Sequence, residues 1–163
     1  MKHLLLSALA LGILPAAHAG TINISYSEDF AEKLTEEYGE REGEYLIKAL
    51  KSDLEYAFGE DLAVIGDVNV VIEDARPNRP TFKEMGDTPG LSMQSFGVGG
   101  ARVSAVVMDA NGEPLSDMSY EWYESDIKWA KGSNTWSDAK RAFDRFSRKL
   151  DKKVDKARAA DVS

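Results

Sequence analysis

The side chains that most often carry out acid–base, nucleophilic and metal chemistry are almost missing from this chain. Its 163 residues contain no cysteine, and both histidines, His3 and His18, lie within the first nineteen residues. Once that segment is removed, no His-dependent general base, no nucleophile activated by histidine and no His/Cys metal site can form. We therefore expect a protein that is not an enzyme and that carries neither a metal nor another cofactor.

The first nineteen residues have the pattern of a secretory signal peptide. Lys2 supplies the positive start, residues 4–14 the apolar stretch, and Ala17-His18-Ala19 a cleavage site of the A-x-A type before Gly20. The apolar stretch, about 11 residues long, is too short to span a bilayer, and no later stretch is apolar enough to do so. We expect cleavage after Ala19 and a soluble periplasmic protein, with release from the cell as the alternative.

Carboxylates are the remaining candidates for catalysis. The chain has 28 Asp and Glu residues, and two carboxyl groups across a cleft are sufficient for glycoside hydrolysis. The best-placed pairs are Glu73 with Asp74 at the end of one expected strand, and Glu121 with Glu124 on another. A solvated acidic surface explains the same residues. A carboxylate-dependent hydrolase of envelope glycans is therefore the alternative hypothesis.

Three short motifs match functional patterns only in part. Asp109-Ala-Asn-Gly112 lacks the spacing of an EF-hand calcium loop but suits a hairpin turn, because Asn-Gly tolerates positive φ. Gly97-Val-Gly-Gly100 lacks the third glycine of a dinucleotide fingerprint and predicts backbone freedom at the start of a strand. Ser125-Asp-Ile-Lys128 matches S-x-x-K without the S-D-N and K-T-G motifs that accompany it. None of the three predicts a site.

Hydrophobic periodicity predicts four strands and three helices. Alternation predicts strands at 21–26, 67–74, 101–109 and 115–124, and three- and four-residue spacing predicts helices at 28–38, at 44–58 and from 135 onward. Thr135 or Ser137 can cap the last helix, whose end is expected to fray from Lys152. We predict one α+β domain over residues 20–158 with a frayed tail at 159–163. Its sheet has about four strands, mixed or antiparallel, with amphipathic helices packed on one face.

The segment between the second and third strands is unusually long. Residues 76–100 hold three prolines and five glycines. Connections of this length are uncommon in compact domains and are often functional. We predict that this segment is a contact surface, and its candidate binding residues are Arg76, Asn78, Arg79 and Thr81.

Aromatic residues gather around the end of the last expected strand. Tyr120 and Trp122 share one face, which is expected to pack under the helices, and Tyr123 points to the other face. Tyr123 with Trp129 is a candidate site for a glycan or a peptide. Cross-strand packing explains the same residues without a ligand.

Charge is unevenly distributed along the chain. Residues 20–139 carry a net charge of −14, whereas residues 140–163 carry +5. The overall acidity argues against nucleic-acid binding. The basic C-terminal helix, with Arg145, Lys149 and Lys152 as candidate binding residues, fits anionic lipid head groups or an acidic partner. A solvated helix, or one that lies beside acidic residues 28–44, explains the same charges.

Two parts of the sequence carry a family resemblance. They are the strand pair Gly99-Gly-Ala-Arg-Val-Ser-Ala with Asp109-Ala-Asn-Gly-Glu, and the helix Thr135-Trp-Ser-Asp-Ala-Lys-Arg-Ala-Phe-Asp-Arg-Phe. The chain resembles a proteobacterial domain-of-unknown-function family of small envelope lipoproteins, in which a strand pair and a W-x-D-A-x-x-A-x-x-x-[FW] helix recur. The resemblance implies an envelope location and an α/β architecture, and it brings no catalytic residues. The chain lacks the lipid-bearing cysteine of that family, so anchoring to the outer membrane does not follow.

The main hypothesis is therefore a non-catalytic periplasmic protein that acts as a binding or envelope-assembly module. Its contact surfaces are the long Pro/Gly-rich segment and the basic C-terminal helix, and its partner is another envelope protein or an anionic envelope component. A structural or homo-oligomeric protein that uses an exposed sheet edge is a third possibility. The identity of the partner and the oligomeric state stay open.

Overall fold

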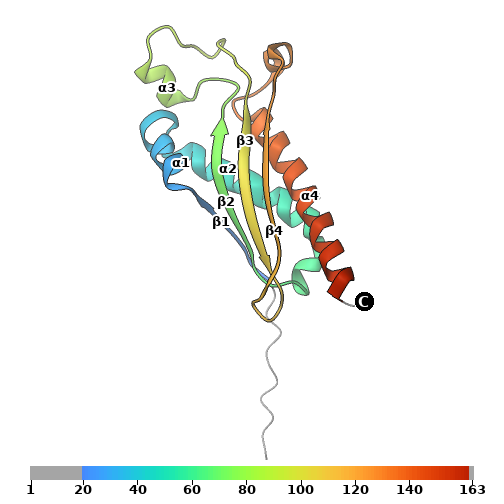
Figure 1. Cartoon of the computed structure of the whole chain (residues 1–163). Helices are drawn as coiled ribbons and strands as arrows, with labels where there is room; N and C mark the ends of the chain where they lie inside the picture. The colour runs from blue at the N-terminus through green and yellow to red at the C-terminus, as the bar shows by residue number, and fades with distance from the viewer. Residues whose placement is uncertain (1–19, 162–163) are drawn as a thin grey trace, which may run out of the picture.

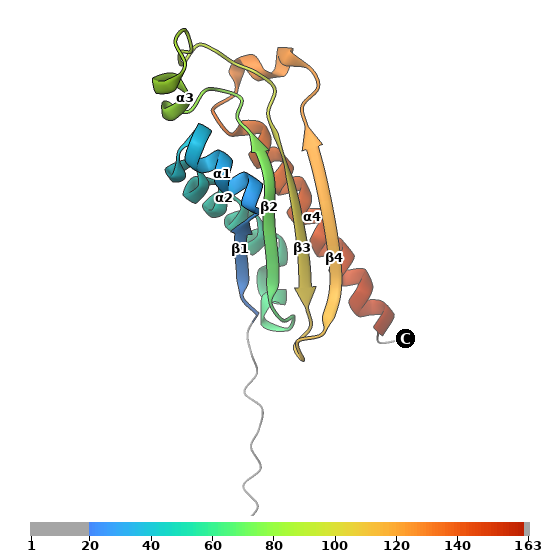
Figure 2. The same cartoon turned by 60° about the vertical axis from the view of Figure 1, so that its left-hand side comes forward.

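The computed structural model describes residues 20–161, in which a four-stranded sheet carries helices on one face (Figure 1). The strands lie in the order β1 (Ile22–Tyr26), β2 (Val68–Arg76), β3 (Gly100–Met108) and β4 (Pro114–Tyr123). β1 and β2 are parallel, and the other two pairs are antiparallel. Helices α2 (Glu40–Phe58) and α4 (Ser137–Asp161) lie behind the sheet in both views, so its second face is open (Figure 2). The predicted α+β class with a mixed sheet is confirmed.

A helical crossover makes the parallel pairing of β1 and β2 possible. From β1 the chain passes through α1 (Glu28–Lys33), a π-helical turn η1 (Leu34–Tyr38), α2 and a 3-10 turn η2 (Gly59–Ala63) before it enters β2. The single helix predicted at 28–38 is thus α1 followed by a π turn. Gly39, at φ 100°, then redirects the chain into α2, a backbone conformation that glycine adopts without steric cost.

The core lies between the sheet and the two long helices. Strand residues of the helix-facing side alternate with residues of the open face, as a period of two requires. Burial of each large aliphatic or aromatic side chain contributes roughly 1.5–3 kcal/mol, so this layer is the main source of stability. Its fully buried members include Leu46, Leu50 and Leu54 of α2, Val70, Ile72 and Val103 of the sheet, and Phe143, Phe146 and Leu150 of α4.

Helix α4 is longer than the sequence predicts. Its apolar spacing continues through Leu150 and Val154, both buried, and the helix runs to Asp161. Near its end the Arg158 guanidinium lies 2.9 Å from the Asp61 carboxylate in η2. Residues 152–161 are therefore helical, and fraying of this end stays a prediction. The predicted signal peptide and residues 162–163 lie outside them.

Strands β1 and β4 form the two edges of the sheet. The Lys153 ammonium of α4 donates a hydrogen bond to the backbone carbonyl of Asp117 on β4. Among residues 20–161, no helix combines the length and apolar character that crossing a membrane requires.

Asp53 makes the α2–α4 interface sensitive to pH. Partial burial and the Asp144 carboxylate raise the pKa of Asp53 from 3.8 to about 6, and Lys140 and Arg148 oppose this rise. The folded protein therefore binds a proton that the unfolded chain has released, and stability falls as pH rises from 3.8 to about 6.

We expect Asp53→Asn to raise the free energy of unfolding by about 1 kcal/mol at neutral pH, allowing for solvent screening of a partly exposed group. Near pH 4 the gain is expected to vanish, because the wild-type carboxyl is then protonated in the folded state. Urea unfolding at the two pH values measures both numbers, with Asp117→Asn on the open face as the control. A gain that is larger in acid would contradict this assignment.

Candidate functional site

The candidate site is the end of the sheet where β2 finishes and β3 begins, which we call the loop end (Figure 1). It consists of the β2–β3 connection, 77–99, and the β4–α4 connection, 124–136. The first contains a short helix, α3 (Phe82–Asp87), and the second a 3-10 turn, η3 (Ile127–Gly132). The segment predicted to be irregular therefore contains a helix, which starts at a capping box between Thr81 and Glu84.

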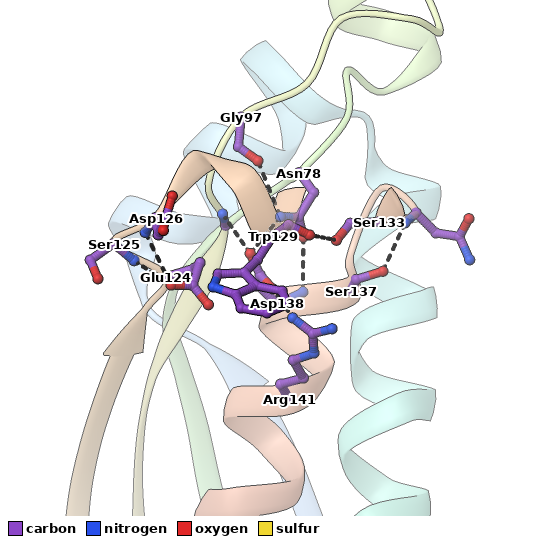
Figure 3. Close-up of polar contacts among 12 residues, drawn as sticks. Asn78, Gly97, Glu124, Ser125, Asp126, Trp129, Ser133, Ser137, Asp138 and Arg141 are labelled. Carbon is purple, nitrogen blue, oxygen red and sulfur yellow. Dashed lines mark hydrogen bonds and ion pairs between the residues drawn. The ribbon is translucent and has the colours of Figure 1, made fainter. Parts of the chain in front are cut away.

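Asn78 and Asp138 join the β2–β3 connection to the first turn of α4 in the protein interior. Asn78 is 1% exposed and Asp138 is 0% exposed. The Asn78 Oδ1 accepts a hydrogen bond of 2.8 Å from the backbone N–H of Asp138, and Asn78 Nδ2 donates to Asp138 Oδ2 (Figure 3). A residue 60 positions earlier thus satisfies a backbone donor in the first turn of α4. Ser137, expected as a cap, instead accepts a hydrogen bond from the backbone of Asn134.

The Asp138 carboxylate also binds one group of the β2–β3 connection and one of α4. It accepts a hydrogen bond of 3.1 Å from the backbone N–H of Gly99 and lies 2.9 Å from the Arg141 guanidinium. A Cβ atom on Gly99 would lie 2.6 Å from the Arg76 carbonyl and 2.9 Å from Asn78 Oδ1. The sequence predicts that these glycines provide backbone freedom. At Gly99 the reason is different, because the backbone of β2 and the Asn78 side chain approach too closely for a Cβ atom.

Arg79 ties the long connection to the one before α4. Its Nε donates a hydrogen bond of 2.8 Å to the Ser133 carbonyl and its Nη2 one of 2.6 Å to the Lys131 carbonyl. Its Nη1 donates to the Met93 carbonyl at 3.0 Å. The guanidinium also lies 5.6 Å from the centroid of the Phe96 ring.

Three of the predicted binding residues thus have internal partners. Asn78 and Thr81 are buried, and the donors of Arg79 point to backbone carbonyls. These side chains hold the loop end in shape, and their part in binding stays a prediction.

Several exposed side chains of the loop end are large and apolar, although polar residues are exposed beside them. Phe82, at the start of α3, is 80% exposed, and Trp129 in η3 is 67% exposed. Met93, Phe96 and Ile127 are also exposed. Exposed aromatic side chains are enriched at protein interfaces. Of this group, only Trp129 was singled out from the sequence.

A hollow of about 660 Å³ lies between α3 and the start of α2. The π turn η1 and Gly39 form one wall, and α3 forms another. π turns often occur at functional sites. The lining mixes apolar and charged groups and includes Tyr38, Arg41, Glu42, Tyr45, Phe82 and Lys83.

Contacts with an aromatic residue hold the wall of this hollow against the end of the β4–α4 connection. Tyr38 and Trp136 meet edge to face at 5.6 Å between ring centroids, and Trp136 Nε1 donates a hydrogen bond of 2.6 Å to the Glu42 carboxylate. Burial, helped by the charge of Glu37, raises the pKa of Tyr38 to about 12, so its hydroxyl stays protonated at physiological pH. It can offer a ligand a hydrogen bond but not a base.

Tyr123 and Arg76, the other predicted residues near this end, belong to a network on the open face. The Tyr123 hydroxyl donates a hydrogen bond of 2.6 Å to Asp74, and the Arg76 guanidinium lies 5.0 Å from the Tyr123 ring centroid. Lys33 lies 2.7 Å from the same carboxylate. Tyr123 is therefore turned towards β2.

Only some of the candidate catalytic carboxylates lie near one another. Arg102 lies 3.7 Å from both Glu73 and Glu121, whereas Glu124 accepts backbone hydrogen bonds in the turn after β4. Burial acts to raise the pKa of Asp74, but hydrogen bonds from Lys33 and Tyr123 outweigh it and lower that pKa. A general acid needs the opposite shift.

The predicted residues of the basic helix lie on its exposed side. Arg145 lies 4.2 Å from the ring centroid of Trp122 on β4, and Lys149 lies 5.6 Å from that of Tyr120. Lys152 is exposed one turn further along. α4 begins at the loop end and runs away from it along the sheet (Figure 1).

Two acidic groups of the described residues resemble ion sites. The Asp109 carboxylate accepts hydrogen bonds from the backbone N–H groups of Asn111 and Glu113, which confirms turn chemistry there. A trio missed by sequence reasoning, Asp61, Asp151 and Asp155, brings one oxygen from each within 4.8 Å of the others. Such a trio could hold a cation, but Arg158 already pairs with Asp61. The absence of a metal stays a prediction.

Comparisons with known proteins do not assign this chain to a family. No protein-family model matches the chain, and no curated protein matches it. Among solved structures, the chain is similar to a minor lipoprotein from Acinetobacter baumannii, with 7% sequence identity and a TM-score of 0.36 over 86% of this chain and 95% of the other. A likeness this weak carries no inference about function, and membership of the envelope lipoprotein family stays a prediction.

Proposed function

We propose that this protein is a non-catalytic binding or assembly module of the cell envelope, exported to the periplasm, which contacts partners through the loop end and through α4. One observation carries the proposal: the loop end is fixed from inside, yet it exposes apolar side chains. Asn78, Arg79 and Asp138 hold its backbone by hydrogen bonds. Phe82 and Trp129 project into solvent.

This combination favours binding for two physical reasons. Covering exposed apolar surface is favourable on association. A surface that is already ordered loses little conformational entropy when a partner binds, so more of that gain appears as affinity. Aromatic side chains such as Phe82 and Trp129 are also typical anchors at the centre of protein interfaces.

The hollow beside α3 supports a peptide segment as the contacted part of a partner. Tyr45 and Phe82 can cover an apolar side chain, while Arg41, Glu42 and Lys83 offer charges of both signs to a polypeptide backbone. Such a mixture of apolar surface with a few polar groups is usual in ligand sites.

Envelope location rests on the sequence of residues 1–19, and the absence of catalysis rests on the lack of His and Cys after them. The alternative, a carboxylate-dependent hydrolase of envelope glycans, has weaker support. Its candidate carboxylates Glu73 and Glu121 share Arg102 on the open face, and the pKa of Asp74 beside them is lowered.

Site-specific photo-crosslinking in cells tests the binding role. A benzophenone amino acid replaces Phe82 in one variant and Tyr56 in a matched control, because Tyr56 is an aromatic residue of α2 that is 87% exposed but lies outside the loop end. We expect a discrete adduct with an envelope protein from position 82 and none from position 56. Mass spectrometry of the adduct identifies the partner and the peptide that was contacted.

A second variant with the crosslinker at Trp129 makes the result independent of one position. If neither 82 nor 129 gives an adduct above the level of position 56, the loop end is not a contact surface. Deletion of the whole connection is a poorer test, because it would also remove the Asn78 cap from α4.

A further inference from the structure

The outer side of α4 carries a continuous line of positive charge. Between Arg141 and Lys156, eight residues of the helix are exposed, and all except Asp155 are Arg or Lys. Their three- and four-residue spacing places them along one side of the helix, over a rise of about 22 Å. We call six of them the cationic stripe: Arg141, Arg145, Arg148, Lys149, Lys152 and Lys156.

Three acidic residues of α4, namely Asp144, Asp151 and Asp155, lie towards neighbouring elements, although Asp155 is exposed beside Lys156. The Asp144 carboxylate raises the pKa of Asp53 on α2, and Asp151 lies beside Asp61 of η2. Asp144 also pairs with Arg148 at the margin of the stripe, and Asp138 with Arg141 at its first residue. The centre of the stripe, from Arg145 to Lys152, therefore presents cations to solvent.

Two aromatic rings of β4 support that centre. Trp122 lies under the Arg145 guanidinium and Tyr120 under the Lys149 ammonium, at 4.2 Å and 5.6 Å from the ring centroids. Cation–π contacts of this kind hold the stems against the protein while the charges stay at the surface. The stripe is thus a positioned array of charge.

The stripe lacks the exposed apolar side chains that the loop end has. The centre of a protein–protein interface is depleted of charge and relies on apolar anchors, which the exposed residues between Arg141 and Lys156 do not provide. A straight line of cations on a convex helix instead matches a flat, negatively charged surface.

Building on the contact role proposed for α4, we propose that the cationic stripe binds the surface of a bilayer that contains anionic phospholipid. α4 then lies along the head groups, with Arg145, Lys149 and Lys152 nearest to their phosphates. The chain has a net charge of −8, so the rest of the molecule is repelled from the same surface. The attraction and the repulsion together give the bound protein one orientation.

Co-sedimentation of the purified, exported protein with vesicles tests the proposal. The vesicles are phosphatidylcholine with or without phosphatidylglycerol. We expect binding only to the vesicles with phosphatidylglycerol and release as the salt concentration rises. Changing Arg145, Lys149 and Lys152 together to Glu is expected to lower the partition coefficient by about tenfold or more.

A matched triple variant controls for net charge. Changing Lys48, Lys128 and Lys131 to Glu alters the charge equally at exposed positions outside α4, and binding is expected to stay within about threefold of wild type. Thermal unfolding confirms that each variant folds. Lys149→Glu/Lys152→Glu keeps the Arg145–Trp122 contact and replaces the triple variant if that one fails to fold.

Each of three vesicle results would overturn the proposal. They are no binding to anionic vesicles at low ionic strength, equal binding to neutral vesicles, and equal losses of binding in the two triple variants. Preference for soluble polyglutamate over vesicles would also overturn it and would indicate an acidic protein partner. Crosslinking from position 82 does not depend on the stripe, so failure of this proposal is distinguishable from failure of the loop-end contact.

Discussion

Replacement of Asp138 with alanine is expected to lower the free energy of unfolding by about 2–4 kcal/mol. The substitution removes the acceptor of the Gly99 backbone N–H and one of the two acceptors of Asn78 Nδ2, and both donors are left buried. It also leaves the Arg141 guanidinium without its partner at 2.9 Å. Urea unfolding followed by tryptophan fluorescence measures the loss.

The reciprocal bonds between Asn78 and Asp138 make a double-mutant cycle informative. We expect Asn78→Ala to cost about as much as Asp138→Ala, and the double variant to cost clearly less than the two losses added together. Asp126→Ala is the control, because this partly exposed carboxylate accepts only a local hydrogen bond from Lys128, and its loss should cost about 1 kcal/mol. Strict additivity of Asn78→Ala and Asp138→Ala would mean that the pair does not act as a unit.

Gly100→Ala is expected to destabilise the protein by about 3 kcal/mol through backbone collision. A Cβ at this position would lie 2.3 Å from the Trp122 carbonyl oxygen and 2.5 Å from Tyr123 Cα. Gly100 also has a φ of 157°, which L-residues rarely adopt. Because Gly100 pairs with Tyr123, the substitution pushes β3 and β4 apart at the loop end.

Gly97 provides the matched control in the same motif. A Cβ added there meets no atom within 4 Å, so Gly97→Ala is expected to change stability by less than about 0.5 kcal/mol. Hydrogen exchange of the β4 amides near Tyr123 should accelerate in the Gly100 variant and stay unchanged in the Gly97 variant. Similar losses in both variants would show that the motif needs flexibility and not close approach.

The sheet and the long helices can be predicted from the sequence because their signals are local. Alternation in 67–74 and 101–109 marks the two central strands, and Asn111-Gly112 fixes the hairpin between β3 and β4. The apolar spacing that begins at Trp136 defines α4, and the helix continues past Lys152, where fraying is expected, to Asp161. Each of these patterns is complete within about 20 residues, so no distant contact is needed to interpret it.

The loop end could not be predicted in the same way, because its contacts join distant parts of the chain. Asn78 and Asp138 are 60 positions apart, and Arg79 meets carbonyls 52 and 54 positions later. Sequence reasoning therefore interprets polar residues in a long connection as ligand contacts and does not show that several of them satisfy backbone groups. The sequence does contain a signal for the position of Phe82, because Thr81 and Glu84 have the spacing of a capping box and predict a helix start at that point.

The position of α4 over β4 has a consequence for solubility. An exposed edge strand of ten residues is a template on which another copy could add its own strand. Pairing of two β4 strands would bring the cations of both α4 helices together, and Lys153 already occupies the Asp117 carbonyl on this strand. Charge repulsion and a blocked acceptor thus oppose fibril growth from this edge.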